Sequence, residues 1–164
     1  MTMPSTSTLP TPYELGNQNQ TTTWAQCIAF YEALTAQFPG ILRLWQIGST
    51  NSGRPLHAGI VTADGVLDHA TLRAGNRPVF FNNNGIHPGE PEGVDVCMAL
   101  VRDFCLQPEL RAALGNTVFL FIPLYSVDGA CNRNNTSRVN QVGPELFGFR
   151  GNARNLDLNR DFIK

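Results

Sequence analysis

The sequence predicts an α/β sandwich with a mixed, partly parallel sheet. Stretches with the alternating or continuous apolar character of strands occur in turn with stretches whose apolar residues recur every three or four positions, as on an amphipathic helix. Strands that alternate with helices along a chain are typical of α/β folds in which some neighbouring strands run parallel. The chain has 164 residues, 42% of them hydrophobic, which is enough for one domain with a buried core.

The folded domain is expected to comprise residues 23–164. Residues 1–22 are rich in Ser, Thr, Pro, Asn and Gln and are expected to form a flexible arm. Thr23 and Gln26 form a capping box, a pattern that starts a helix. The helix that follows is predicted to end before Pro39, and its apolar stripe comprises Trp24, Cys27, Ile28, Tyr31, Leu34 and Phe38.

Strands and further helices are predicted in the rest of the domain. The strands are expected at residues 41–48, 56–62, 77–83 and 116–124, with a turn at 51–55 between the first two. An apolar stripe predicts a second long helix over residues 94–104, and residues 108–114 predict a short one. Regular patterning stops at residues 125–154, a stretch rich in Asn, Arg and Gly whose length is typical of functional or disordered loops.

Composition and charge argue against several classes of function. A formal net charge of −1 argues against nucleic acid or an acidic membrane surface as the main partner. No apolar run approaches the roughly 18 residues of a membrane span. No signal peptide is visible, so the cytoplasm is the default location unless an export signal has been removed. The cysteines show no metal-binding spacing, and Cys27, Cys97 and Cys105 are expected in the core rather than in disulfides.

Polar residues follow the predicted strand at 77–83. His87 and Glu90 lie just beyond its carboxyl end, where α/β enzymes place their sites. A spacing of three on a helical turn brings two side chains to one face, and imidazole and carboxylate both bind Zn²⁺. A surface loop with a helix-capping glutamate is the alternative interpretation. Gly85 and Gly89, together with the asparagines, favour a tight polar turn at the strand exit.

A second group of candidate residues lies at positions 150–162, in the segment RGNARNLDLNRDF. Its arginines and asparagines could bind a small carboxylate, because guanidinium pairs bidentately with a carboxylate and the asparagine amide adds a neutral donor. The alternative is a solvated basic loop. The alternating leucines, Leu156 and Leu158, predict a short strand that would hold Asn159 and Arg160 rigidly.

Three segments in the same order and spacing make the chain resemble the zinc carboxypeptidases, the M14 metallopeptidase family. NNNGIHPGE resembles the family's first zinc motif, and RGNARNLDLNRDF closely matches its segment with Asp-Leu-Asn-Arg. YSVDGA is similar to its Asn-Pro-Asp-Gly segment, with Ser126 and Val127 in place of Asn-Pro. The resemblance covers roughly residues 20–164. It implies a three-layer sandwich with a mixed, partly parallel sheet, of which this chain would be the N-terminal part.

The resemblance implies roles for five residues by position. His87 and Glu90 would be ligands of one Zn²⁺. Arg150 would polarise the scissile carbonyl and stabilise the oxyanion. Asn159 and Arg160 would bind the terminal carboxylate of a peptide substrate.

Two aspartates and two histidines are expected to have lesser roles. Asp128 and Asp157 match framework positions of the family, for which a structural role is expected. His57 and His69 match no motif, and they are expected to be bystanders in a strand and at a helix start.

The resemblance implies a zinc metallocarboxypeptidase, which would hydrolyse the C-terminal peptide bond of peptides with a metal-activated water. In the family the third zinc ligand, the glutamate general base and a substrate-side tyrosine come later, so they are expected beyond Lys164 and the chain alone is expected to be inactive. Two alternatives stay open. One is a zinc-dependent deacylase of N-acyl amino acids, which shares the motifs; the other is a non-catalytic carboxylate-binding module. The extended loop after Tyr125 favours the peptidases.

Overall fold

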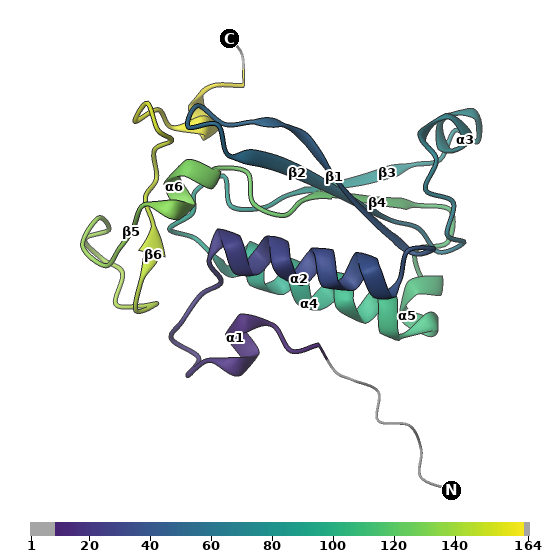
Figure 1. Ribbon diagram of the computed structural model, residues 1–164, viewed down its shortest axis with the longest axis horizontal. Coiled ribbons are helices and arrows are strands. Elements are labelled where there is room, and N and C mark those ends of the chain that lie inside the picture. The colour runs from purple at the N-terminus through teal and green to yellow at the C-terminus, as the bar shows by residue number, and fades with distance from the viewer. Residues whose placement is uncertain (1–8, 163–164) are drawn as a thin grey trace, which may run out of the picture.

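The computed structural model describes residues 9–162, and its centre is a four-stranded sheet (Figure 1). The strands are β1 (Leu42–Ser49), β2 (Pro55–Val61), β3 (Val79–Asn83) and β4 (Val118–Ile122), in the order β1-β2-β4-β3. β2 is antiparallel to both of its neighbours, whereas β3 and β4 are parallel. The predicted mixed, partly parallel sheet is therefore confirmed.

Two long helices, α2 (Trp24–Gln37) and α4 (Glu92–Leu106), cover one face of the sheet (Figure 1). α2 begins at the predicted capping box, in which the Gln26 N–H donates to the Thr23 hydroxyl and the Thr23 N–H donates to the Gln26 side chain. The helices and the sheet enclose the main core, whose fully buried members include Cys27, Tyr31, Leu34, Met98, Val101 and Phe121. The four cysteines are free thiols, and the three that were expected in the core are buried.

Close packing of β2 against β4 depends on Gly59. A Cβ atom at this position would come within 2.2 Å of Cζ of Phe121. The ring of Phe121 therefore lies across β2 in space that a side chain would fill. It also contacts Tyr31 of α2, with ring centroids 5.0 Å apart. Gly59 thus lets the aromatic core reach from the sheet to the helix layer.

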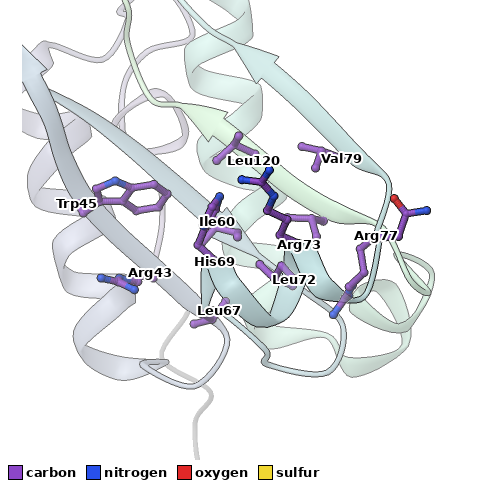
Figure 2. Close-up of a pocket in the computed structure, with 12 residues that line it drawn as sticks. Arg43, Trp45, Ile60, Leu67, His69, Leu72, Arg73, Arg77, Val79 and Leu120 are labelled. Atoms are coloured by element: carbon purple, nitrogen blue, oxygen red, sulfur yellow. The ribbon is translucent and has the colours of Figure 1, made fainter.

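The short helix α3 (His69–Ala74) covers one end of the opposite face. Leu72 packs there against Ile60 and Val118 in a second, smaller cluster. A cavity of about 710 Å³ opens beside this cluster. Figure 2 shows that Trp45 of β1 and Arg73 of α3 both line it. None of the predicted site residues is among the residues that line it.

β3 is an edge strand among residues 9–162 and its outer side is apolar. Val79, Phe80 and Phe81 are 57%, 60% and 53% exposed. Phe80 stacks on Phe119 of β4, with ring centroids 5.8 Å apart.

No helix within residues 9–162 is long and apolar enough to cross a bilayer.

One prediction for the C-terminal third is incomplete and another is wrong. Residues 125–154 contain regular structure, namely α6 (Val127–Cys131) and the strands β5 (Arg133–Asn134) and β6 (Phe147–Gly148), which pair antiparallel. Residues 156–158 do not form a strand, and the 3₁₀ helix η1 (Leu158–Arg160) follows instead. The Asp157 carboxylate accepts the backbone N–H of Asn159 at 2.9 Å, which caps this turn and ends extended structure.

Residues 9–22 lie against the domain and include the short helix α1 (Pro12–Leu15). Thr21 and Thr22 are buried, and the hydroxyls of both donate to the carboxylate of Asp95 in α4. Residues 1–8 of the expected flexible arm lie outside the described residues. The domain boundary at residue 23 stays a prediction. The remaining helix, α5 (Pro108–Ala112), follows α4 directly.

Candidate active site

The candidate site lies where β3 and β4 end. Because these strands are parallel, their carboxyl ends meet at one edge of the sheet. The N–H groups of Tyr125 and Ser126 donate to the carbonyls of Asn84 and Gly85, at 2.8 and 3.1 Å. The segment after β4 therefore lies against the segment after β3. Asn84 is buried and its side chain donates to the carbonyl of Ile122 at 2.9 Å, which joins the two strand ends.

His87 and Glu90 face each other in the turn that follows Gly85. The Glu90 N–H donates to the His87 carbonyl at 2.9 Å, which closes a tight turn. The sequence predicted a helical turn here, but α4 begins only at Glu92. Nδ1 of His87 lies 3.6 Å from Oε1 of Glu90. This separation is too long for a hydrogen bond. It is close to the roughly 3.4 Å that separates two donor atoms bound to one tetrahedral zinc ion at about 2.1 Å.

Asp157 connects His87 with Arg150. Oδ1 of Asp157 lies 2.9 Å from Nε2 of His87, and Oδ2 accepts the Nε–H of Arg150 at 2.8 Å. An ionised carboxylate only accepts, so Nε2 carries the hydrogen, and in the neutral imidazole the lone pair is then on Nδ1. The hydrogen bond with His87, followed by those from Asn159 and Arg150, lowers the pKa of Asp157 to about 2. The sequence predicted only a framework role for this residue.

Asn159 and Arg160 lie one step further along this network. The backbone N–H of Asn159 donates to the same Oδ1 of Asp157 that contacts His87. Nη1 of Arg160 donates to the carbonyl of Asn159 at 3.0 Å, and both side chains are exposed. The five residues that the sequence predicted for the site are thus linked through Asp157 and the turn at His87.

Asp128 lies apart from this network and joins α6 to the turn between β1 and β2. Its Oδ1 accepts from the Thr50 hydroxyl at 2.8 Å and from the Arg54 guanidinium at 3.0 Å. Burial raises the pKa of Asp128, but these hydrogen bonds outweigh it and hold the pKa below its usual value. The contacts agree with the structural role that was expected for this residue.

Two candidate metal ligands converge here, and no third one joins them in the described part of the chain. Among residues 9–162, no group of three His, Cys, Asp or Glu side chains is arranged to hold a metal ion. His57 lies in β2 and His69 at the start of α3, on other parts of the sheet. Within these residues, His87 and Glu90 are therefore an incomplete set for a catalytic zinc, which takes three protein ligands.

Arg138 is a further site residue that the sequence did not predict. Its Nη2 donates to Oε1 of Glu90 at 2.9 Å. This hydrogen bond and the charge of Arg138, then the charge of His87, lower the pKa of Glu90. Gln141 donates to the carbonyl of Gly89 at 3.1 Å, so the loop that carries Arg138 lies on the His-Pro-Gly-Glu turn. The only signal in the sequence was the high Arg and Asn content of residues 125–154.

Residues 27–164 match the family model of the zinc carboxypeptidases. Carboxypeptidase D of Mus musculus is 31% identical over an alignment of 148 positions, which covers 82% of this chain and 11% of that protein. Carboxypeptidase A1 of Rattus norvegicus is 29% identical over an alignment of 114 positions, which covers 67% of this chain and 25% of that protein. The chain thus spans a quarter or less of the length of these two relatives.

Solved structures share the fold. A metallo-carboxypeptidase from Burkholderia cenocepacia matches with a TM-score of 0.61 and 20% identity, over 87% of this chain and 33% of its own. Carboxypeptidase A from Helicoverpa armigera matches with a TM-score of 0.61 and 14% identity, over 77% of this chain and 29% of its own. The chain corresponds to a third or less of these folded proteins.

Proposed function

The chain belongs to the zinc carboxypeptidase family, and from this premise we propose that it carries part of the catalytic centre of a zinc-dependent metallocarboxypeptidase. The enzyme would remove the last residue of peptides that have a free C-terminal carboxylate. One observation carries the proposal. Nδ1 of His87 and Oε1 of Glu90 are 3.6 Å apart, while the other ring nitrogen of His87, Nε2, is hydrogen-bonded to Asp157. The similarity to carboxypeptidases of mouse and rat supports the same class of activity.

His87 and Glu90 would hold the zinc ion. Asp157 accepts the hydrogen on Nε2, which fixes the tautomer and orientation of the ring and leaves Nδ1 as the ligand atom. When bound, zinc supplies an activated water and polarises the scissile carbonyl. We place the third ligand and the general base in a later part of the catalytic domain, as the resemblance to the family implies.

Arg150 would stabilise the negative charge that develops on the carbonyl oxygen. Its Nε–H donates a hydrogen bond to Asp157, and Asp157 is also hydrogen-bonded to His87. This contact fixes the guanidinium beside the candidate metal ligands. The terminal nitrogens of Arg150 make no hydrogen bond or ion pair within residues 9–162. They are therefore free to donate to an oxyanion.

Asn159 and Arg160 would bind the terminal carboxylate of the substrate. Asp157 holds the backbone of Asn159, so this pair keeps a fixed distance from His87. Both side chains are exposed to solvent, as a substrate-binding pair must be. An arginine fork beside an amide donor matches the two oxygens of a carboxylate.

Hydrolysis assays on the complete protein with zinc would test the proposal. We expect cleavage of a blocked dipeptide with a free C-terminal carboxylate and no cleavage of its C-terminal amide. His87→Ala should abolish this activity, whereas His69→Ala should keep it. Faster hydrolysis of an N-acyl amino acid would identify a deacylase. Binding of the dipeptide without any hydrolysis would identify a non-catalytic carboxylate-binding module.

A further inference from the structure

Arg138 lies where a metal ion would contact Glu90. Nη2 of Arg138 is 2.9 Å from Oε1 of Glu90, and the same Oε1 is the oxygen that lies 3.6 Å from Nδ1 of His87. The carboxylate oxygen that faces the candidate ligand His87 is therefore already paired with a positive charge. In this arrangement, the guanidinium and a metal ion would compete for one oxygen atom.

The surrounding loop positions Arg138 for this contact. Gly89 has no side chain, and a Cβ atom at this position would lie 2.8 Å from Cδ and 3.1 Å from Nη1 of Arg138. The arginine side chain therefore lies across the backbone of the turn that joins His87 to Glu90. Gln141 holds the same turn by donating to the carbonyl of Gly89. The side chain of Arg138 is 30% exposed and that of Glu90 is 50% exposed, so their ion pair is accessible to solvent and its strength is that of a surface pair.

We propose that Arg138 is a positioning residue of the metal site. Its guanidinium holds the Glu90 carboxylate beside His87 until zinc takes the place of the guanidinium. The inference rests on the proposed function, because it takes His87 and Glu90 as the metal ligands. Two cations on one carboxylate oxygen repel each other, so zinc held at Oε1 of Glu90 would weaken the ion pair between Arg138 and Glu90. Arg138 therefore prepares the site and at the same time lowers its affinity for zinc.

A cavity next to the turn has room for the displaced guanidinium. It has a volume of about 460 Å³ and is lined by residues 137–141 and by Arg150. None of these lining residues is acidic, so the displaced arginine gains no new carboxylate partner there. This pocket therefore offers no carboxylate to replace Glu90, and the affinity for zinc would fall by at most the strength of that ion pair.

Zinc titrations of the metal-free complete protein test this inference. We expect Arg138→Met to bind zinc about fivefold more tightly than the wild type, the upper range for an ion pair of this exposure. Arg138→Lys keeps the charge without the planar fork, so its zinc affinity should lie between those of the wild type and Arg138→Met. Arg154→Met is the matched control, because it removes the same charge from an exposed arginine with no side-chain contact to Glu90 within residues 9–162. It should leave the affinity unchanged.

A second pair of variants separates this inference from the metal assignment itself. In a Glu90→Gln background the neutral amide no longer attracts the guanidinium, so adding Arg138→Met should leave the remaining zinc affinity unchanged. Equal or weaker zinc binding by Arg138→Met, with tight binding lost in His87→Ala, would overturn the role of Arg138 and leave the metal site intact. Zinc binding that is undetectable in every variant, or unaffected by His87→Ala, would overturn the metal site and this inference with it.

Discussion

At the scale of single residues, Asp157 determines how the candidate site is organised. One carboxylate contacts the ring of His87, the guanidinium of Arg150 and the backbone of Asn159. A sequence motif indicates that such an aspartate is present, but it does not show which side chains it bonds. Those bonds join residues that are far apart in the chain, so only the fold reveals that Asp157 holds the two candidate motifs together.

The pKa of Asp157 makes its contribution to stability dependent on pH. Its pKa is about 2 in the folded protein, and an unperturbed aspartate has a pKa of about 3.9. A lowered pKa means that the stabilisation is present above about pH 4 and is lost as the pH falls toward about 2. We expect the difference in free energy of unfolding between wild type and Asp157→Asn to shrink over this range. Urea unfolding at a series of pH values measures it; a difference that does not change with pH would contradict the assignment.

The two arginines of the proposed mechanism should have separable kinetic effects in the complete enzyme. Arg150 is assigned to charge that develops in the transition state, so Arg150→Ala should lower kcat by about 10²–10³. Arg160 is assigned to a carboxylate that is present before and during the reaction, so Arg160→Ala should mainly raise KM. Steady-state kinetics on a blocked dipeptide would measure both effects, with Arg154→Ala as the control. The reverse pattern would mean that the two roles are exchanged.

At the scale of elements, periodicity predicted the parts of the fold that are stabilised by burial. The stripe from Cys27 to Leu34 and the apolar run at Val118–Ile122 became a core helix and a core strand, since each pattern has a face to bury. The C-terminal third could not be predicted in the same way. The turn η1 depends on the side chain of Asp157, and the arginine of β5 is anchored by carbonyls of Thr21 and Leu146. These contacts leave no periodic signal in the sequence.

Gly59 offers a test of the packing between β2 and β4. Gly59→Ala would place a methyl group against the ring of Phe121, so the ring or the strand must shift. Overpacking of this kind costs about 1–3 kcal/mol, and we expect a loss of unfolding free energy in that range. Gly48→Ala in β1 is the matched control, because nothing lies within 4 Å of a Cβ atom there. Urea unfolding that shows equal effects for both variants would contradict this account of the core.

At the scale of the whole molecule, the N-terminal segment and the loop that carries Arg138 support each other. Arg133 donates to carbonyls of both Thr21 and Thr22, and the Glu145 N–H donates to the carbonyl of Asn19 at 2.6 Å. Arg133 and Glu145 flank Arg138 on either side in the sequence. The segment before α2 therefore holds both ends of the loop that reaches Glu90.

The edge of the sheet gives the last prediction, which concerns the 164-residue chain expressed on its own. β3 is one of the two edge strands of the four-stranded sheet within the described residues, and its exposed residues Val79, Phe80 and Phe81 leave an apolar edge with unpaired backbone groups. Such an edge pairs readily with other chains. We expect the isolated chain to self-associate as its concentration rises and to be inert towards blocked dipeptides even with zinc, because within residues 9–162 only two candidate zinc ligands converge and no third one joins them.

Phe81→Lys should reduce this association, because a charge on an edge strand opposes pairing with a second strand. Val142→Lys is the matched control: it introduces the same charge at a fully exposed position in a loop away from the edge, and it should leave the association unchanged. Sedimentation velocity at several concentrations distinguishes these outcomes. A chain that stays monomeric throughout, or variants that associate equally, would show that β3 is not the surface through which the chain associates.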